Sequence, residues 1–279
     1  MPAAIQTFRN SQSPVEALDA LRAQIAKIEG HTQSLNTDVK AKAWTSGFAE
    51  LDAALGGALN FGAVHEIVPQ LPVDLPVASA FAFGLIARLP RRGPVFWAMS
   101  SLGNAEHGAP YMPGLAAFGI NPSRIINVAV RHPRDLAFVL EEAAKLTSLA
   151  AIIAEGPPPS FTASRRLALL LGTSRVPMLF LLDGKSGQGS AAETRFVVSP
   201  LAVPEAAFDN LSPGPPAFNV TLARNRGGRP GLSFEMVFDH ASISFRPPGL
   251  APFSRAQPDS VPNRQFSVES AEQRRAWAS

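Results

Sequence analysis

Residues 45–79 read TSGFAELDAALGGALNFGAVHEIVPQLPVDLPVAS, and this stretch decides the fold. Its pattern predicts a turn, a short helix, a Gly-Gly break and a buried strand over residues 63–68. A loop then leads into an apolar helix that starts near Pro76. In nucleotide-binding folds a phosphate binds at such a loop, at the N-terminus of the helix that follows it. The stretch therefore predicts the scaffold of a nucleotide site.

The loop after Ile67 lacks the residues that bind a phosphate. A phosphate loop needs backbone N–H groups on glycines, a lysine for the phosphates, and a Ser or Thr for Mg²⁺. This loop, VPQLPVDLP, has no glycine and no lysine. Its prolines at 69, 72 and 76 have no N–H to donate, and Asp74 would repel a phosphate. We therefore expect no cofactor, no metal ion and no catalysis.

The composition is that of a large α/β domain. The chain has 279 residues, of which 46% are hydrophobic and 17% charged, so it can bury a sizeable core. It has no cysteine, which excludes disulfides and thiolate metal sites, and its five histidines show no metal-binding spacing. The most apolar stretch, residues 75–89, is shorter than the ~20 residues of a membrane-spanning helix. We expect a cytoplasmic protein with no membrane segment.

The middle of the chain alternates strand and helix patterns. The strands are apolar throughout, which is typical of a mostly parallel sheet with both faces covered. After a proline-rich break at residues 212–217, strands joined by the turn RGGRPG indicate antiparallel pairing. The predicted strands span 94–100, 125–130, 149–156, 176–184 and 194–201, and the predicted helices span 112–118, 135–146 and 162–174, the last capped by Thr162.

The two ends of the chain differ from this core. Residues 1–13 are predicted to be a disordered lead, and residues 14–43 an amphipathic helix with a linker. The helix places Leu18, Leu21, Ile25 and Ile28 on one face. That face packs on its own domain, or it docks on a neighbouring subunit or a different protein. Residues 44–247 form the core, and the proline- and serine-rich residues 248–279 are predicted to be a flexible tail.

Two basic segments are candidates for contact with a partner or with DNA. The formal net charge is only +3, but arginine supplies most of the positive charge. Arg224, Asn225, Arg226 and Arg229 lie on a glycine-rich turn, from which arginines can reach phosphate or carboxylate oxygens. Lys185 lies in the loop 183–191 and could contact a phosphate backbone. The alternative for both segments is that they are only solvated.

Three polar residues of the predicted strands are weighed as catalytic groups. Glu155 ends the strand 149–156, where an ATPase would hold Mg²⁺ through water. We interpret it as an exposed carboxylate that pairs with Arg165 or Arg166. His65 and Glu66 alternate faces of their strand, so they form no paired site, and His65 is interpreted as a structural residue.

Several segments together resemble a known family. GFAELDAALGGALNFGAVHEI resembles the entry to a RecA-type core, and YMPGLAAFGINPSRIINV, LAAIIAEG and TASRRLALLL follow in the RecA order. With TRFVVS and LARNRGGRPG, the set resembles the ImuA family. These are RecA-like proteins of bacterial damage-induced mutagenesis, which share features with SulA-type division inhibitors. The resemblance covers roughly residues 14–247.

The resemblance implies a RecA-like core and a non-catalytic accessory role in translesion synthesis. The implied partners are an ImuB-type Y-family polymerase homologue and an error-prone C-family DNA polymerase. Contact with DNA and self-association are further expectations. Two alternatives stay open at this point: a DNA-dependent ATPase with a divergent nucleotide site, and a SulA-like cell-division inhibitor.

Overall fold

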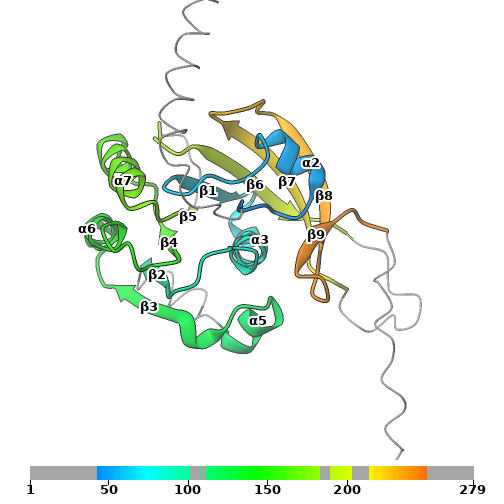
Figure 1. Ribbon diagram of the computed structural model, residues 1–279, viewed down its shortest axis with the longest axis horizontal. Helices are drawn as coiled ribbons and strands as arrows, with labels where there is room; N and C mark the ends of the chain where they lie inside the picture. The colour runs from blue at the N-terminus through cyan, green and yellow to red at the C-terminus, as the bar shows by residue number, and fades with distance from the viewer. Residues whose placement is uncertain (1–42, 101–107, 109–110, 183–188, 203–213, 250–279) are drawn as a thin grey trace, which may run out of the picture. The chain divides into compact units, whose positions relative to one another are not determined.

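The computed structural model describes residues 43–100, 108, 111–182, 189–202 and 214–249. In this part of the chain one nine-stranded sheet has the order β3-β2-β4-β5-β1-β6-β7-β8-β9 (Figure 1). The strands are β1 Val64–Pro69, β2 Val95–Ser100, β3 Ile125–Val130, β4 Ala151–Gly156, β5 Met178–Leu182, β6 Thr194–Pro200, β7 Ala217–Asn225, β8 Leu232–Asp239 and β9 Ser244–Arg246. The helices are α2 Ala49–Ala54, α3 Leu75–Ala87, α5 Met112–Ala117, α6 Pro133–Ala144 and α7 Phe161–Ser174, with 3-10 turns η1 Pro72–Asp74 and η2 Pro122–Arg124.

Strands β1 to β6 pair in parallel, as the apolar strands predict. Every residue of β4 and β5 is buried, because helices lie on both faces of these central strands. Parallel strands end at one edge of the sheet, so the loops after β1, β2 and β4 meet there. The edge strand β3 departs from the prediction of full burial, because Ile126 and Asn127 are exposed.

Strands β6 to β9 pair antiparallel, which confirms the prediction for the C-terminal part of the core. The glycine-rich turn joins β7 to β8, and a bulge lies between Arg195 and Phe196 of β6. Burial alternates along β6 and along most of β7. Alternation of this kind is typical of a sheet whose one face packs on a core while the other faces solvent.

The core lies in two layers, one on each face of the sheet. On the α3 side, Phe81 packs against the rings of Phe196, Phe218 and Phe245 at centroid distances of 5.3–5.9 Å. On the other side, α6 and α7 pack on the strands through residues such as Leu140. Burying each large apolar side chain contributes about 1.5–3 kcal/mol relative to its exposure.

Helix α7 begins earlier than the sequence predicts. Ser160, not Thr162, is the N-cap, and its Oγ accepts a hydrogen bond from the Ala163 N–H at 3.3 Å. Three prolines at 157–159 precede Ser160. Proline disfavours helical backbone in the residue before it, so the chain becomes helical only once Pro159 is passed. The first residue after the cap is then Phe161.

In the part of the chain that the structure describes, no helix is long and apolar enough to cross a membrane.

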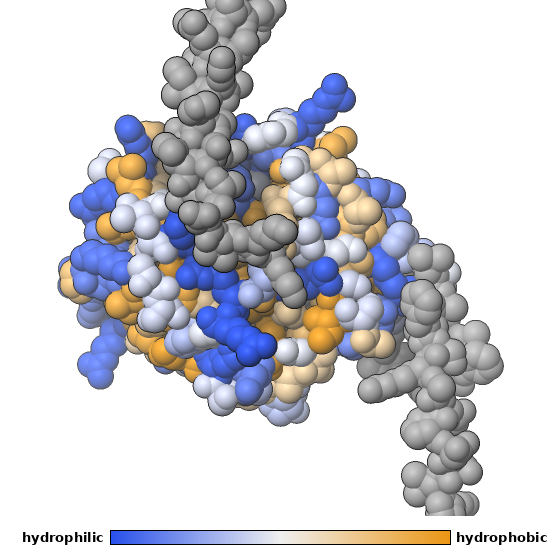
Figure 2. Space-filling model, in the orientation of Figure 1, coloured by the Kyte–Doolittle hydropathy of each residue, from blue (hydrophilic) through white to orange (hydrophobic). Residues whose placement is uncertain are grey.

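The surface of the described residues mixes apolar and polar side chains. On the face shown in Figure 2, hydrophobic residues are scattered among hydrophilic ones. Singly exposed apolar residues are normal on a protein surface.

Candidate functional site

The loop after β1 uses its own backbone donors. The Gln70 N–H donates to Val198 O at 2.8 Å, and the Asp74 N–H donates to Leu71 O at 2.9 Å. The Leu71 N–H donates to the Asp74 carboxylate at 3.0 Å, and the Leu75 N–H donates to the carbonyl of Pro72. A phosphate site needs several N–H groups that point to one open position. These four donors are already engaged within the fold.

At the N-terminus of α3, where a nucleotide phosphate would place its negative charge, this chain has the carboxylate of Asp74. Asp74 is buried and precedes the first residue of α3, where the helix dipole favours an anion. The helix itself begins with Leu75 and Pro76. Neither side chain can bind a phosphate or a magnesium ion. At the position where a nucleotide-binding fold would hold the phosphates, this chain therefore has a carboxylate, two apolar residues and N–H groups that are already hydrogen-bonded.

Glu155 is buried, so its interpretation as an exposed carboxylate was wrong. It lies at the carboxyl end of β4, opposite Met99 of β2. Arg166, one of its two expected partners, instead forms an ion pair with Glu141 at 2.6 Å. The guanidinium of Arg165, the other, lies over the Phe161 ring at 5.8 Å from its centroid. Both arginines lie on the outer part of α7, whereas Glu155 faces the α3 layer with its strand neighbour Ile153.

The glycine-rich turn is fixed on helix α2. The Asn225 side-chain amide donates to Ala54 O at 2.8 Å, and its oxygen accepts from the Gly227 N–H at 3.2 Å. A Cβ on Gly228 would lie 2.5 Å from the same Ala54 oxygen, so only glycine fits there. Asn225 is thus a structural residue of the turn. Arg226 and Arg229 are the members of this candidate site that are exposed.

Arg224 and Arg195 lie side by side on β7 and β6. The Arg195 Nε donates to the Glu66 carboxylate at 2.7 Å, and the Arg224 guanidinium donates to Ser190 O at 2.6 Å. The Ser190 hydroxyl also donates to Glu66. Burial, followed by the positive charges of Arg226 and Arg195, lowers the pKa of Arg224, which remains charged. Glu66 therefore pairs with Arg195, and Arg224 lies close enough to Arg226 and Arg195 for their charges to act on its pKa.

His65 is a structural residue, as the sequence predicts. Its Nε2 lies 2.9 Å from Asn60 O, and its Nδ1 lies 2.8 Å from the Thr194 hydroxyl. A carbonyl oxygen only accepts, so Nε2 carries the proton and the neutral ring accepts from Thr194. Burial lowers the pKa of His65, which keeps it neutral. Both ring nitrogens are therefore occupied within the fold.

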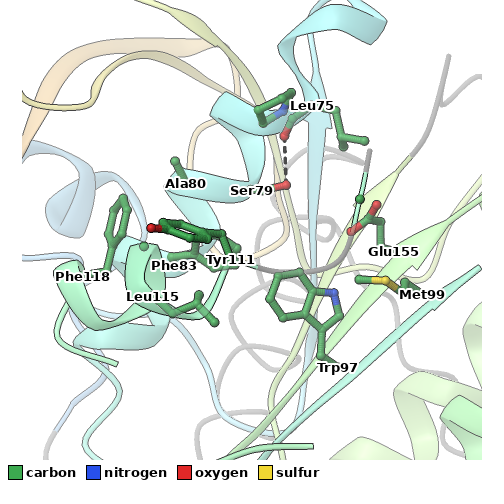
Figure 3. A pocket seen from close by; sticks show the side chains of 13 residues that line it. Leu75, Ser79, Ala80, Phe83, Trp97, Met99, Tyr111, Leu115, Phe118 and Glu155 are labelled. Atoms are coloured by element: carbon green, nitrogen blue, oxygen red, sulfur yellow. Dashed lines mark hydrogen bonds between the residues drawn. The ribbon is translucent and has the colours of Figure 1, made fainter. Parts of the chain in front are cut away.

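Some predicted site residues lie outside the described part of the chain. They are Lys185 of the loop 183–191 and the helix residues Leu18, Leu21, Ile25 and Ile28. Sequence reasoning in turn missed two features. One is the Glu66–Arg195 pair, for which the only signal was a glutamate in an apolar strand. The other is an aromatic pocket beside Trp97 (Figure 3).

The comparisons with known proteins agree with the observed fold. The chain matches no model of a protein family. It is 33% identical over 192 residues to Protein ImuA of Caulobacter vibrioides, in strain NA1000 / CB15N and in strain ATCC 19089 / CIP 103742 / CB 15. Those residues cover 63% of this chain and 75% of each relative. The fold is similar to the crystal structure of the RadB recombinase, with a TM-score of 0.50 and 13% identity, over 73% of this chain and 99% of that chain. That similarity shows a RecA-like fold.

Proposed function

The chain belongs to the ImuA family, and on that premise we propose that it is a non-catalytic accessory protein of damage-induced translesion synthesis. In this proposal it works in the cytoplasm as a RecA-like scaffold. Its partners are an ImuB-type Y-family polymerase homologue and, directly or through that protein, an error-prone C-family DNA polymerase.

The loop after β1 is the observation that carries the proposal. It keeps the strand, turn and helix of a nucleotide site, but the Asp74 carboxylate accepts the Leu71 N–H and prolines occupy positions 69, 72 and 76. The sheet around it is complete and well packed. The sheet is kept, but the N–H groups that would bind a phosphate are hydrogen-bonded within the loop. This combination supports a role in which the protein binds partners through its surface.

Thermal unfolding with and without ATP–Mg²⁺ tests the proposal. A ligand that binds only the folded state stabilises it by RT ln(1 + [L]/Kd). We expect no change in melting temperature with ATP–Mg²⁺ at about 1 mM, the upper end of typical Michaelis constants. A rise would support the alternative, a DNA-dependent ATPase with a divergent site. The buried Glu155 at the end of β4 is the observation that favours this alternative.

The partner surface in this proposal is the exposed part of the glycine-rich turn. Arg226 and Arg229 are exposed, and Asn225 fixes the turn on α2. Preorganised arginines bind carboxylates and phosphates with two parallel hydrogen bonds. This geometry supports contact with an acidic protein surface or with DNA phosphates.

Charge reversal at the turn tests that surface. The double variant Arg226→Glu/Arg229→Glu should weaken capture of the ImuB-type protein at least about tenfold, because like charges then face each other. Arg134→Glu is the matched control, since Arg134 is a highly exposed arginine on α6. Equal capture by the double variant and the control would show that the turn is only solvated.

A further inference from the structure

The amino edge of the parallel sheet carries a row of arginines. Strands β1 to β6 all begin at this edge, which is opposite the edge where the loops after β1, β2 and β4 meet. Strand β7 runs antiparallel to β6, so its last residue, Asn225, pairs with Thr194 at the start of β6 and brings the glycine-rich turn to the same edge. The arginine row consists of Arg124 before β3, Arg91 and Arg92 before β2, Arg175 before β5, and Arg226 and Arg229 in the turn.

Backbone carbonyls position the members of the arginine row. The Arg124 Nη2–H donates to Arg91 O at 3.1 Å, and the Arg91 guanidinium donates to Arg175 O at 2.6 Å. At the other end of the row, the Arg226 N–H donates to Glu193 O at 3.0 Å. Burial, followed by the positive charge of Arg175, lowers the pKa of Arg91, which remains charged. The row is therefore fixed on the edge of the sheet, and its charges lie close enough to act on one another.

The positive charge of the arginine row faces solvent. Among the residues that the structure describes, no arginine of the row forms an ion pair with a carboxylate. Glu193 lies at the same edge, but it is half-buried and accepts a hydrogen bond from the Asn60 side-chain amide. Glu142, at the end of α6, pairs with Lys145. The members of the row with exposed side chains are Arg92, Arg175, Arg226 and Arg229.

An open hollow lies at the β3 end of the row. Its volume is about 620 Å³, and it is lined by Arg92, Gly93, Pro94, Asn121, Ser123 and Arg124. The Asn121 Oδ1 accepts from the Ser123 N–H at 3.0 Å and from its hydroxyl at 2.8 Å, so the remaining polar group of Asn121 is its NH₂ donor. The described lining thus offers guanidinium and amide donors and contains no carboxylate. Donors of this kind bind the oxygens of an anion such as phosphate.

The length of the arginine row favours a linear polyanion. From β3 to β7 the sheet order has six strand-to-strand steps (Figure 1), which at about 4.8 Å each give a row of about 29 Å. One strand of DNA carries a phosphate about every 3.4 Å along the helix axis, so the row has the length of about eight phosphates. Protein interfaces have an apolar, aromatic centre, whereas DNA interfaces are more polar and more positive. The hollow is of the second kind, since Pro94 is the one apolar side chain in its described lining.

We propose that the arginine row binds the phosphate backbone of duplex DNA. The exposed arginines donate to phosphate oxygens along one strand, and the hollow takes one phosphate between Arg92 and Asn121. Contacts to phosphates alone carry no sequence information, so the binding is independent of sequence. The inference rests on the proposed function only in sharing Arg226 and Arg229 of the turn, and the rest of the row is a surface that the proposed function does not use.

Fluorescence anisotropy of a labelled DNA duplex of about 20 base pairs, titrated with the full-length protein, tests the inference. We expect a Kd between about 1 and 100 μM at physiological salt, the range of sequence-independent binding. Each phosphate that an arginine neutralises contributes about −0.9 to the slope of log K against log [salt]. The four exposed members of the row therefore predict a slope of about −3.5 or steeper.

A double variant at the end of the row outside the turn separates this surface from other positive charges of the chain. Arg92→Gln/Arg175→Asn should weaken binding at least about tenfold and make the slope shallower by about 1.8. Asn at 175 tolerates the left-handed backbone found there, where φ is 59°. Arg134→Gln/Arg165→Gln removes the same number of charges from exposed arginines of α6 and α7, and should bind within about twofold of wild type. If the first variant fails to fold, Arg92→Glu alone should still weaken binding.

Competition with polyglutamate distinguishes DNA from an acidic protein surface. An extended polypeptide places one charge about every 3.5 Å, whereas duplex DNA places one about every 1.7 Å of its axis. We therefore expect the duplex to bind at least about tenfold more tightly than polyglutamate with the same number of charges. Equal binding of the two polymers would overturn the inference in favour of an acidic protein partner.

Two other results would overturn the inference: no binding of the duplex, or the same loss in the Arg92/Arg175 variant as in the Arg134/Arg165 control. Neither result depends on the ATP–Mg²⁺ melting experiment or on capture of the ImuB-type protein. The variants also leave Arg226 and Arg229 of the turn unchanged. The DNA surface and the scaffold proposal can therefore fail separately.

Discussion

Replacing Glu66 with Gln is the most direct test of how the Arg195 side chain is held. Glu66 is buried in β1, where 3% of its side chain is exposed, and 17% of the Arg195 side chain is exposed. Gln has the same shape, and its oxygen can still accept from the Ser190 hydroxyl. Its amide carries no charge, however, so Arg195 loses the ion pair with Glu66 while the charges of Arg224 and Arg226 stay nearby.

The cost can be estimated from the burial of the pair. Removing one partner of a buried ion pair costs about 3–5 kcal/mol, because the other charge stays uncompensated. Arg195 keeps some contact with solvent, which places the expected loss near the lower end, at about 3 kcal/mol. For a domain of this size, each kcal/mol lowers the melting temperature by about 2–4 °C, so we expect a decrease of about 6–12 °C.

Urea unfolding of four proteins measures this effect: wild type, Glu66→Gln, Arg195→Met and the double variant. The double variant should be more stable than Glu66→Gln, because it removes both charges of this ion pair, with a coupling free energy of about 2 kcal/mol. Glu142→Gln is the matched control, since Glu142 pairs with Lys145 and both are half exposed. It should cost less than about 1 kcal/mol. If Glu66→Gln costs no more than Glu142→Gln, the reasoning from burial is refuted.

Two further predictions concern the interior. Burial lowers the pKa of His65, so the unfolded chain binds a proton that the folded chain does not. The contribution of His65 to the free energy of unfolding should be complete above about pH 6.5, and should fall below that pH by about 1.4 kcal/mol per pH unit. In urea unfolding, His65→Gln should reduce this dependence of stability on pH. An unchanged pH dependence in the variant would contradict the prediction. Gly84→Ala should destabilise the protein by about 1–3 kcal/mol, because the added Cβ would meet the rings of Phe245 and Phe238. Gly172→Ala, in α7 with open space around it, should instead be neutral or up to about 1 kcal/mol stabilising, and equal effects in calorimetry would refute this.

The sequence predicted the sheet because its signals are local. Short apolar runs such as residues 178–182, bounded by loop residues, are typical of central strands. The turn RGGRPG marks one antiparallel connection, between β7 and β8. The start of α7 was misplaced because two adjacent side chains, Ser160 and Thr162, can both cap a helix. The three prolines before Ser160 set the earliest start of the helix, and the hydrogen bond from the Ala163 N–H to Ser160 Oγ shows that the helix begins as soon as they are passed.

The candidate sites were less predictable because their residues come together only in the folded chain. Glu66 and Arg195 are 129 positions apart, and their contact follows from the pairing of β1 with β6. Glu155 was expected at the surface, since nothing near it in sequence shows that α3 and α5 cover the end of its strand. Asn225 looked like part of a basic site, but its amide holds the turn on Ala54, which is 171 positions away.

The carboxyl edge of the parallel sheet explains why an aromatic pocket lies close to a loop whose N–H groups are engaged within the fold. In this topology the ends of β1, β2 and β4 lie close together whatever residues they carry. At the first of these ends Asp74 accepts the Leu71 N–H, and α3 begins with Leu75 and Pro76, none of which offers a donor to a phosphate. Apolar side chains line the space between the other two ends. The parallel pairing of β2 with β4 holds Trp97 and Glu155 on one face of the sheet, beside the aromatic pocket. The edge that would position phosphate-binding groups in a nucleotide site is therefore lined in this chain mostly by apolar and aromatic side chains.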